Sequence, residues 1–123
     1  MTSVVDASAL LAFLQGEAGA AQVERVLDSS DAVVGSANWS ETARTIIRAG
    51  GDWELARALL LGYGVTVEPV TQDDAEEAAR AWPEESGLSL GDRLSLALGK
   101  RYDATVVTAD RAWDGLPGVS LIR

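Results

Sequence analysis

The chain has 123 residues, and its 19 acidic and 10 basic residues give a net charge of −9. This length predicts one domain whose core is large enough to fold without a disulfide or a structural metal. The sequence contains no cysteine and no histidine, which excludes disulfides, thiolate zinc sites and imidazole catalysis. Any bound metal must therefore have oxygen ligands, which favours a hard ion such as Mg²⁺ or Mn²⁺.

The sequence also bears on location and partners. No apolar segment approaches the length of a membrane span, and the first residues lack the basic region of a signal peptide. We therefore expect a cytoplasmic protein without membrane contact. The negative charge, taken alone, argues against binding to nucleic acid, which usually requires a basic surface.

Short Val-rich segments alternate with helix-like segments along the chain. In chain order we predict a strand at 3–6, helices at 7–15 and 18–29, a strand at 32–37, a helix that opens at Asn38 and stops at Gly50, a helix capped by Asp52 with Gly62 beyond its end, a strand at 65–70, helices at 71–82 and 89–103, and strands at 104–108 and 119–122. Pro69 suggests an edge strand or a strand end. Alternating strands and helices predict one α/β domain over residues 1–123, with a mostly parallel sheet of about five short strands between helices.

Acidic residues follow the predicted strands at the end where ligands bind in parallel sheets. Asp6 ends the first strand and Asp110 follows the fourth, in "TVVTAD". Glu41 lies in the first turn after the second strand, and Asp92 opens the helix that leads to the fourth strand. All four are therefore predicted to lie at the same edge of the sheet.

Each of these acids also has a purely structural interpretation. Asp6 can cap the first helix, and Asn38 and Glu41 have the spacing of a capping box. Asp92 can complement a helix dipole, and Asp110 can start a turn. For a single acid the capping interpretation is the simpler one. Four carboxylates at one edge are different, because they repel each other unless a cation joins them.

A divalent ion held by carboxylates suits the hydrolysis of phosphodiester bonds. Such an ion lowers the pKa of a bound water, orients it and stabilises the leaving oxygen. This chemistry needs neither histidine nor cysteine, which agrees with the composition.

Four motifs in the sequence then carry a family resemblance: "VVDASALLAFL", "ANWSETA", "LSLGDRLSLALG" and "VVTADRAW". In this order and spacing they resemble the PIN-domain ribonucleases, and the chain is similar to VapC toxins of bacterial toxin–antitoxin pairs over nearly its whole length. The resemblance implies a PIN-like fold, RNA cleavage that depends on Mg²⁺ or Mn²⁺, inhibition by a cognate VapB-type antitoxin, and a homodimer.

Carried over residue by residue, the acidic quartet of the family falls on Asp6, Glu41, Asp92 and Asp110. These four are the expected catalytic and metal-binding residues. Ser8 and Thr108 match the hydroxyl residues beside the first and last acids, where we expect them to orient carboxylates. Helix or turn capping is an equally simple role for both hydroxyls.

The resemblance changes the interpretation of the negative charge. RNA would then be held by local basic residues that follow the motif acids, with Arg93 and Arg111 the foremost candidates beside Arg44, Arg48, Lys100 and Arg101. An acidic surface also suits a basic antitoxin. Asp114 is interpreted as a solvated turn residue.

Two further points stay open at the level of the sequence. Trp39 and Trp53 suit a protein interface, whereas core packing is the simpler interpretation of Trp82 and Trp113. The rival to a ribonuclease is a PIN-like module without useful catalysis that binds RNA or a protein partner. A metal-dependent cleavage assay separates the two.

Overall fold

The computed structural model describes residues 1–122 and contains a five-stranded sheet with helices on both faces. The strands are β1 Thr2–Val5, β2 Asp31–Gly35, β3 Thr66–Glu68, β4 Thr105–Thr108 and β5 Val119–Leu121. The helices are α1 Ala7–Leu14, α2 Ala20–Ser29, α3 Ser36–Arg48, α4 Trp53–Gly62, α5 Gln72–Arg80 and α6 Leu90–Tyr102, with the short 3-10 helices η1 Glu84–Ser86 and η2 Arg111–Trp113.

All neighbouring strands pair in parallel, in the order β3-β2-β1-β4-β5. The predicted α/β class with a parallel sheet of five short strands is confirmed. β3 lies at an edge of the sheet and ends before Pro69, as the proline indicated. β1 lies in the centre, so its carboxyl end faces the residues that follow β4 and β2.

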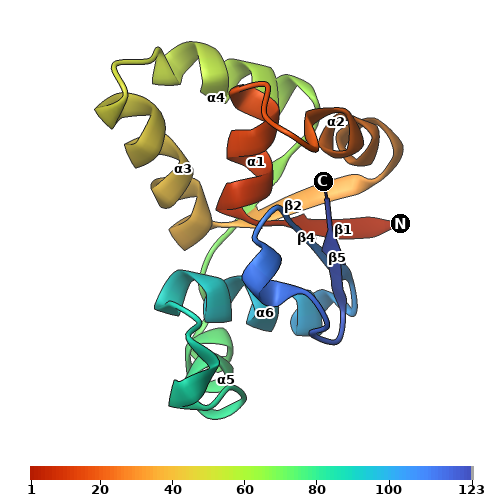
Figure 1. Cartoon of the computed structure of the whole chain (residues 1–123), viewed down its shortest axis with the longest axis vertical. Coiled ribbons are helices and arrows are strands. Elements are labelled where there is room, and N and C mark those ends of the chain that lie inside the picture. The colour runs from red at the N-terminus through yellow and green to blue at the C-terminus, as the bar shows by residue number, and fades with distance from the viewer. Residues whose placement is uncertain (123) are drawn as a thin grey trace.

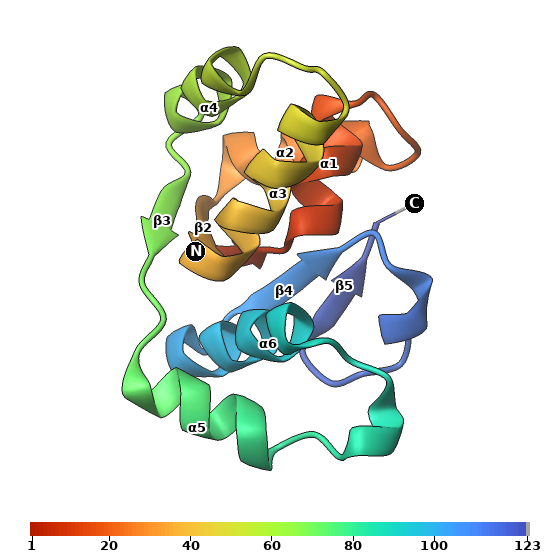
Figure 2. The ribbon, with the colours of Figure 1, turned by 90° about the vertical axis from the view of Figure 1, so that its left-hand side faces the viewer.

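The sheet separates two layers of helices (Figures 1 and 2). Helices α1 to α4 lie on one side, and α5 and α6 lie on the other. A hydrophobic core lies on each side of the sheet, and β1 contributes side chains to both. Val5 packs with Leu10 and Val23 in one core, and Val4 packs with Leu98 in the other. Burial on both faces explains the adjacent valines in β1, β2 and β4.

Local signals place most helix ends. Asp52 accepts a hydrogen bond from the Leu55 backbone N–H at 3.1 Å and caps α4, as predicted. Ser89 caps α6 in a capping box with Asp92, so this helix begins one residue later than its predicted start. Two salt bridges join α6 to α5: Lys100 pairs with Glu77 at 2.7 Å, and Arg101 pairs with Asp74 at 3.1 Å.

The expected capping role of Asn38 is wrong. α3 begins at Ser36, and its N-cap is Gly35, which makes no side-chain cap. Asn38 therefore lies inside the first turn of the helix, where its side chain is buried with 2% of its surface exposed. Asn38 and Glu41 do share a hydrogen bond, but it joins two side chains and caps no backbone group.

Two of the four tryptophans, Trp82 and Trp113, pack in the core as the sequence suggested. Trp113 is buried in the core beneath α6, and Trp82 packs against the same cluster. Trp39 and Trp53 contact each other edge to face with ring centroids 5.0 Å apart, and Trp39 also packs against the other core. Their role at an interface stays a prediction. Within residues 1–122, no helix is both long and apolar enough to cross a membrane.

Candidate metal centre

One pocket of about 200 Å³ brings the four predicted acids together at the carboxyl edge of the sheet. Asp6 reaches it from the end of β1, Glu41 from the first half of α3, Asp92 from the first turn of α6, and Asp110 from the segment after β4. The remaining lining residues are Ala7, Ser8, Leu11, Asn38 and Thr45. The pocket thus collects carboxylates from four segments that are far apart in the sequence.

Asp6 is the most deeply held of the four, with 4% of its surface exposed. Its Oδ1 accepts hydrogen bonds from the Ser8 hydroxyl and from the Ala9 backbone N–H, both at 2.8 Å. Its Oδ2 accepts a hydrogen bond from the Thr108 hydroxyl at 2.6 Å. Asp6 is therefore the N-cap of α1 and a pocket residue at the same time.

The two hydroxyl residues link β1 to the segment after β4. The Ser8 and Thr108 oxygens lie 3.1 Å apart, within hydrogen-bonding distance. The Ala109 backbone N–H donates to the Ser8 hydroxyl at 2.9 Å, and the Asp110 backbone N–H donates to the Thr108 hydroxyl at 3.0 Å. This network orients the Asp6 carboxylate and holds the backbone of Ala109 and Asp110 in position. Metal sites commonly have such hydrogen bonds around their ligands.

Burial shapes the electrostatics of the pocket. Desolvation raises the pKa of Asp6 from 3.8 to about 6, although its three hydrogen bonds oppose the shift, and the nearby charge of Asp92 adds to it. Desolvation also raises the pKa of Glu41, against the Asn38 hydrogen bond and with a further contribution from Asp92. The buried Asp6 carboxylate is thus costly to keep ionised unless a cation offsets its charge.

Asp92 and Asp110 also both cap a helix and line the pocket. An oxygen of Asp92 accepts from the Ser89 backbone N–H at 3.0 Å, and an oxygen of Asp110 accepts from the Ala112 backbone N–H at 2.9 Å. Among the described residues, the second oxygen of each carboxylate has no hydrogen bond. A carboxylate has about four lone-pair sites, so capping a helix leaves it able to bind a cation as well.

The donor set fits a hard divalent ion, since it consists of carboxylate oxygens in a pocket that also admits water. As the side chains lie, no three acidic groups in residues 1–122 converge closely enough to hold one ion together. All four carboxylates nevertheless line the same pocket of about 200 Å³.

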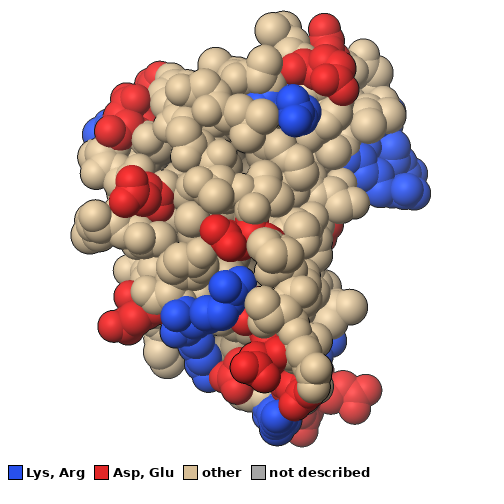
Figure 3. Space-filling model, turned by 180° about the vertical axis from the view of Figure 1, so that it is seen from behind, with Lys and Arg blue, Asp and Glu red and all other residues tan. Residues whose placement is uncertain are grey.

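The basic residues separate into two groups. Arg93 donates to the Ala78 carbonyl at 2.9 Å, so this candidate for RNA binding ties α6 to α5. Arg101 is likewise engaged with Asp74 on α5. Arg111 lies exposed in η2 beside Asp110, and Arg44 is exposed on α3. On the face shown in Figure 3, basic side chains gather in a few places between scattered acids, so the net charge does not cover that face uniformly.

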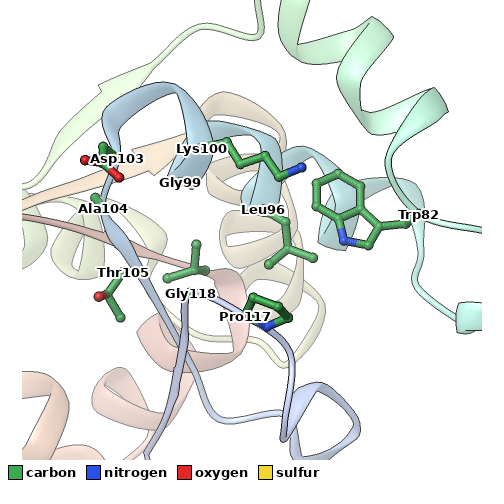
Figure 4. A pocket seen from close by; sticks show the side chains of 10 residues that line it. Trp82, Leu96, Gly99, Lys100, Asp103, Ala104, Thr105, Pro117 and Gly118 are labelled. Carbon is green, nitrogen blue, oxygen red and sulfur yellow. The ribbon is translucent and has the colours of Figure 1, made fainter.

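A second cavity, of about 330 Å³, lies near the carboxyl end of α6 and carries no comparable chemistry (Figure 4). Trp82, Leu96 and Pro117 form much of its wall. Its charged lining residues are Asp103 and Lys100, and Lys100 is paired with Glu77 and lies 4.9 Å from the centroid of the Trp82 ring.

Comparison with known proteins agrees with this geometry. The PIN domain family matches residues 3–119. Ribonuclease VapC42 of Mycobacterium tuberculosis is 32% identical over 108 residues, covering 79% of this chain and 82% of the relative. The chain therefore belongs to the PIN-domain family, among the VapC ribonucleases.

Solved structures show the same fold. The crystal structure of VapC20 of M. tuberculosis, described as a sarcin–ricin loop cleaving toxin, superposes with a TM-score of 0.78 at 22% identity and covers 98% of this chain and 99% of its own. The toxin–antitoxin complex from Klebsiella pneumoniae contains a chain with a TM-score of 0.76 at 20% identity, covering 96% and 95%.

Proposed function

We propose that this chain is a Mg²⁺- or Mn²⁺-dependent endoribonuclease that acts as the toxin of a toxin–antitoxin pair in the cytoplasm. One observation carries the proposal: Asp6, Glu41, Asp92 and Asp110 line a single pocket at the carboxyl edge of a parallel sheet. Membership among the VapC ribonucleases supports the same activity. The solved neighbours include a toxin–antitoxin complex, which supports an antitoxin as partner.

The four carboxylates are the residues that would hold the metal. When bound, Mg²⁺ or Mn²⁺ supplies activation of a water and stabilisation of the leaving oxygen in phosphodiester hydrolysis. Ser8 and Thr108 hold Asp6 in one orientation, so its oxygens are placed before substrate arrives. Arg111 is exposed next to Asp110 in the sequence, which supports a role for it in binding a phosphate of the RNA.

The direct test is cleavage of RNA by the purified chain. We expect products with Mg²⁺ or Mn²⁺ and none in EDTA, because the carboxylates alone offer no strong nucleophile. Gel analysis of a labelled single-stranded RNA measures this, and adding back metal after EDTA is the control for damage to the protein. Absence of cleavage in every metal tested, with RNA or a protein still bound, would favour the alternative of a PIN-like binding module without useful catalysis.

The toxin role is tested in cells. Induction of the wild type without its antitoxin should arrest growth, whereas induction of Asp6→Asn at the same protein level should not. A small VapB-type antitoxin with a basic segment should copurify with the chain, because a net charge of −9 favours a basic partner. Normal growth under strong induction of the wild type contradicts a toxin. Light scattering of the purified chain tests the homodimer that we also propose.

A further inference from the structure

Glu41 is positioned by two residues that have no carboxylate of their own. The Asn38 side-chain amide lies between α3 and α6, where Nδ2 donates to Glu41 Oε1 at 3.0 Å and to the Gly91 carbonyl at 3.1 Å. Both partners are acceptors, so the amide must present its nitrogen to them. Asn38 therefore joins the Glu41 carboxylate to the first turn of α6, which carries Asp92.

Gly91 makes room for this carboxylate. A Cβ atom at position 91 would lie 2.6 Å from Glu41 Oε1, which is closer than such atoms approach in proteins, and 3.0 Å from Glu41 Cδ, so the Glu41 side chain would have to move. The backbone of Gly91 does not have a positive φ, so glycine is not required here for its conformation. What the absent side chain provides is space for Glu41 against α6.

The amide oxygen of Asn38 supports a role beyond stability. Oδ1 is buried and has no hydrogen-bond partner among the described residues. An unsatisfied buried acceptor lowers the stability of a fold. Within a helix, glycine at position 91 also lowers stability relative to alanine. Asn38 and Gly91 each lower the stability of the fold, and both contact the Glu41 carboxylate, which α3 contributes to the pocket.

We propose that Asn38 and Gly91 are positioning residues that hold the Glu41 carboxylate against the first turn of α6, beside Asp92, so that the two acids face the same ion. This inference rests on the proposed metal-dependent function and specifies which residues assemble one side of its site. Neither residue is proposed to bind the metal.

The test measures Mn²⁺ binding by isothermal titration calorimetry and melting temperature in EDTA for each variant. In Gly91→Ala, the new methyl group displaces Glu41, so the dissociation constant for Mn²⁺ should rise by about 10- to 100-fold. Its melting temperature in EDTA should be no lower than that of the wild type, because alanine favours the helix. Asn38→Ala should weaken Mn²⁺ binding to a similar extent.

Thr42→Val is the matched control, because Thr42 is equally buried on α3 and its hydroxyl donates to the Asn38 backbone carbonyl at 2.8 Å rather than to the Glu41 carboxylate. It should melt at a lower temperature and bind Mn²⁺ as the wild type does. Unchanged binding in Gly91→Ala, or a loss of binding matched by a loss of stability, would overturn the positioning role alone. A wild type that binds no Mn²⁺ would overturn both this inference and the proposed function.

Discussion

Asp6→Asn should reduce the rate of RNA cleavage by about a thousandfold at saturating Mg²⁺, since losing a ligand removes several kcal/mol of transition-state stabilisation. The reason lies in the position of Asp6, which is buried in the pocket with both oxygens fixed by Ser8, Ala9 and Thr108. Asparagine keeps the size of the side chain and can still cap α1. The fold should therefore persist, and single-turnover cleavage is the measurement.

Asp114→Asn is the control for the cleavage experiment. Asp114 is exposed, follows η2 and is not part of the lining of the acidic pocket. The Asp114→Asn substitution removes one negative charge, as Asp6→Asn does, at a position four residues from Asp110. Any general effect of charge on RNA binding should therefore be the same in both variants. This variant should cleave within about twofold of the wild type, as expected for an exposed substitution. Cleavage by Asp6→Asn above about a tenth of the wild-type rate would contradict a ligand role for Asp6.

The stability of the metal-free protein should depend on pH through Asp6. Its pKa is raised by burial from 3.8 to about 6, so the folded state binds this proton more tightly than the unfolded state. The stabilisation from protonated Asp6 is fully present below pH 3.8 and is lost as the pH rises through 6. A shift of this size corresponds to at most about 3 kcal/mol.

Denaturant unfolding in EDTA checks this expectation. The free energy of unfolding of Asp6→Asn, measured relative to the wild type, should increase between pH 4 and 7 by up to about 3 kcal/mol and then level off. Asp114→Asn again serves as the control. Mn²⁺ should restore the stability of the wild type at pH 7, since binding to the folded state stabilises it in proportion to the logarithm of concentration. If the difference in free energy of unfolding between Asp6→Asn and the wild type did not change with pH, the pKa of Asp6 would not be raised by its burial.

These two expectations share one physical cause. Asp6 is buried, so the same desolvation that raises its pKa also strengthens its attraction to a cation. Glu41 is more exposed, and its pKa is raised in the same direction. In EDTA, neutralising one acid removes the unfavourable free energy of a buried charge and should stabilise the fold. In the presence of metal, the same change removes a ligand and should slow cleavage. Opposite effects on stability and on cleavage are therefore characteristic of a site acid, and a residue that only caps a helix would not show them.

Much of this protein follows from the sequence by itself. Composition alone restricts any metal to oxygen ligands, because the chain has no histidine and no cysteine. Alternating valine-rich strands and helices predicted the parallel sheet, which places Asp6 and Asp110 at one edge. The Asp52 cap was also predictable. These features depend on residues within one turn of a helix or on the general rule for parallel sheets, and neither requires knowledge of packing.

The tertiary structure decided the contacts that join distant segments. Thr108 contacts Asp6 across 102 residues because β4 pairs with β1, and Asn38 contacts Gly91 across 53 residues because α3 and α6 meet at the carboxyl edge. Sequence spacing suggested that Asn38 was a cap, whereas packing turned its side chain inward. Packing also decided that Arg93 donates to the Ala78 carbonyl on α5, and its contact with RNA stays a prediction. Side-chain direction at such positions is set by which helix packs on which face of the sheet, and that choice depends on the whole core.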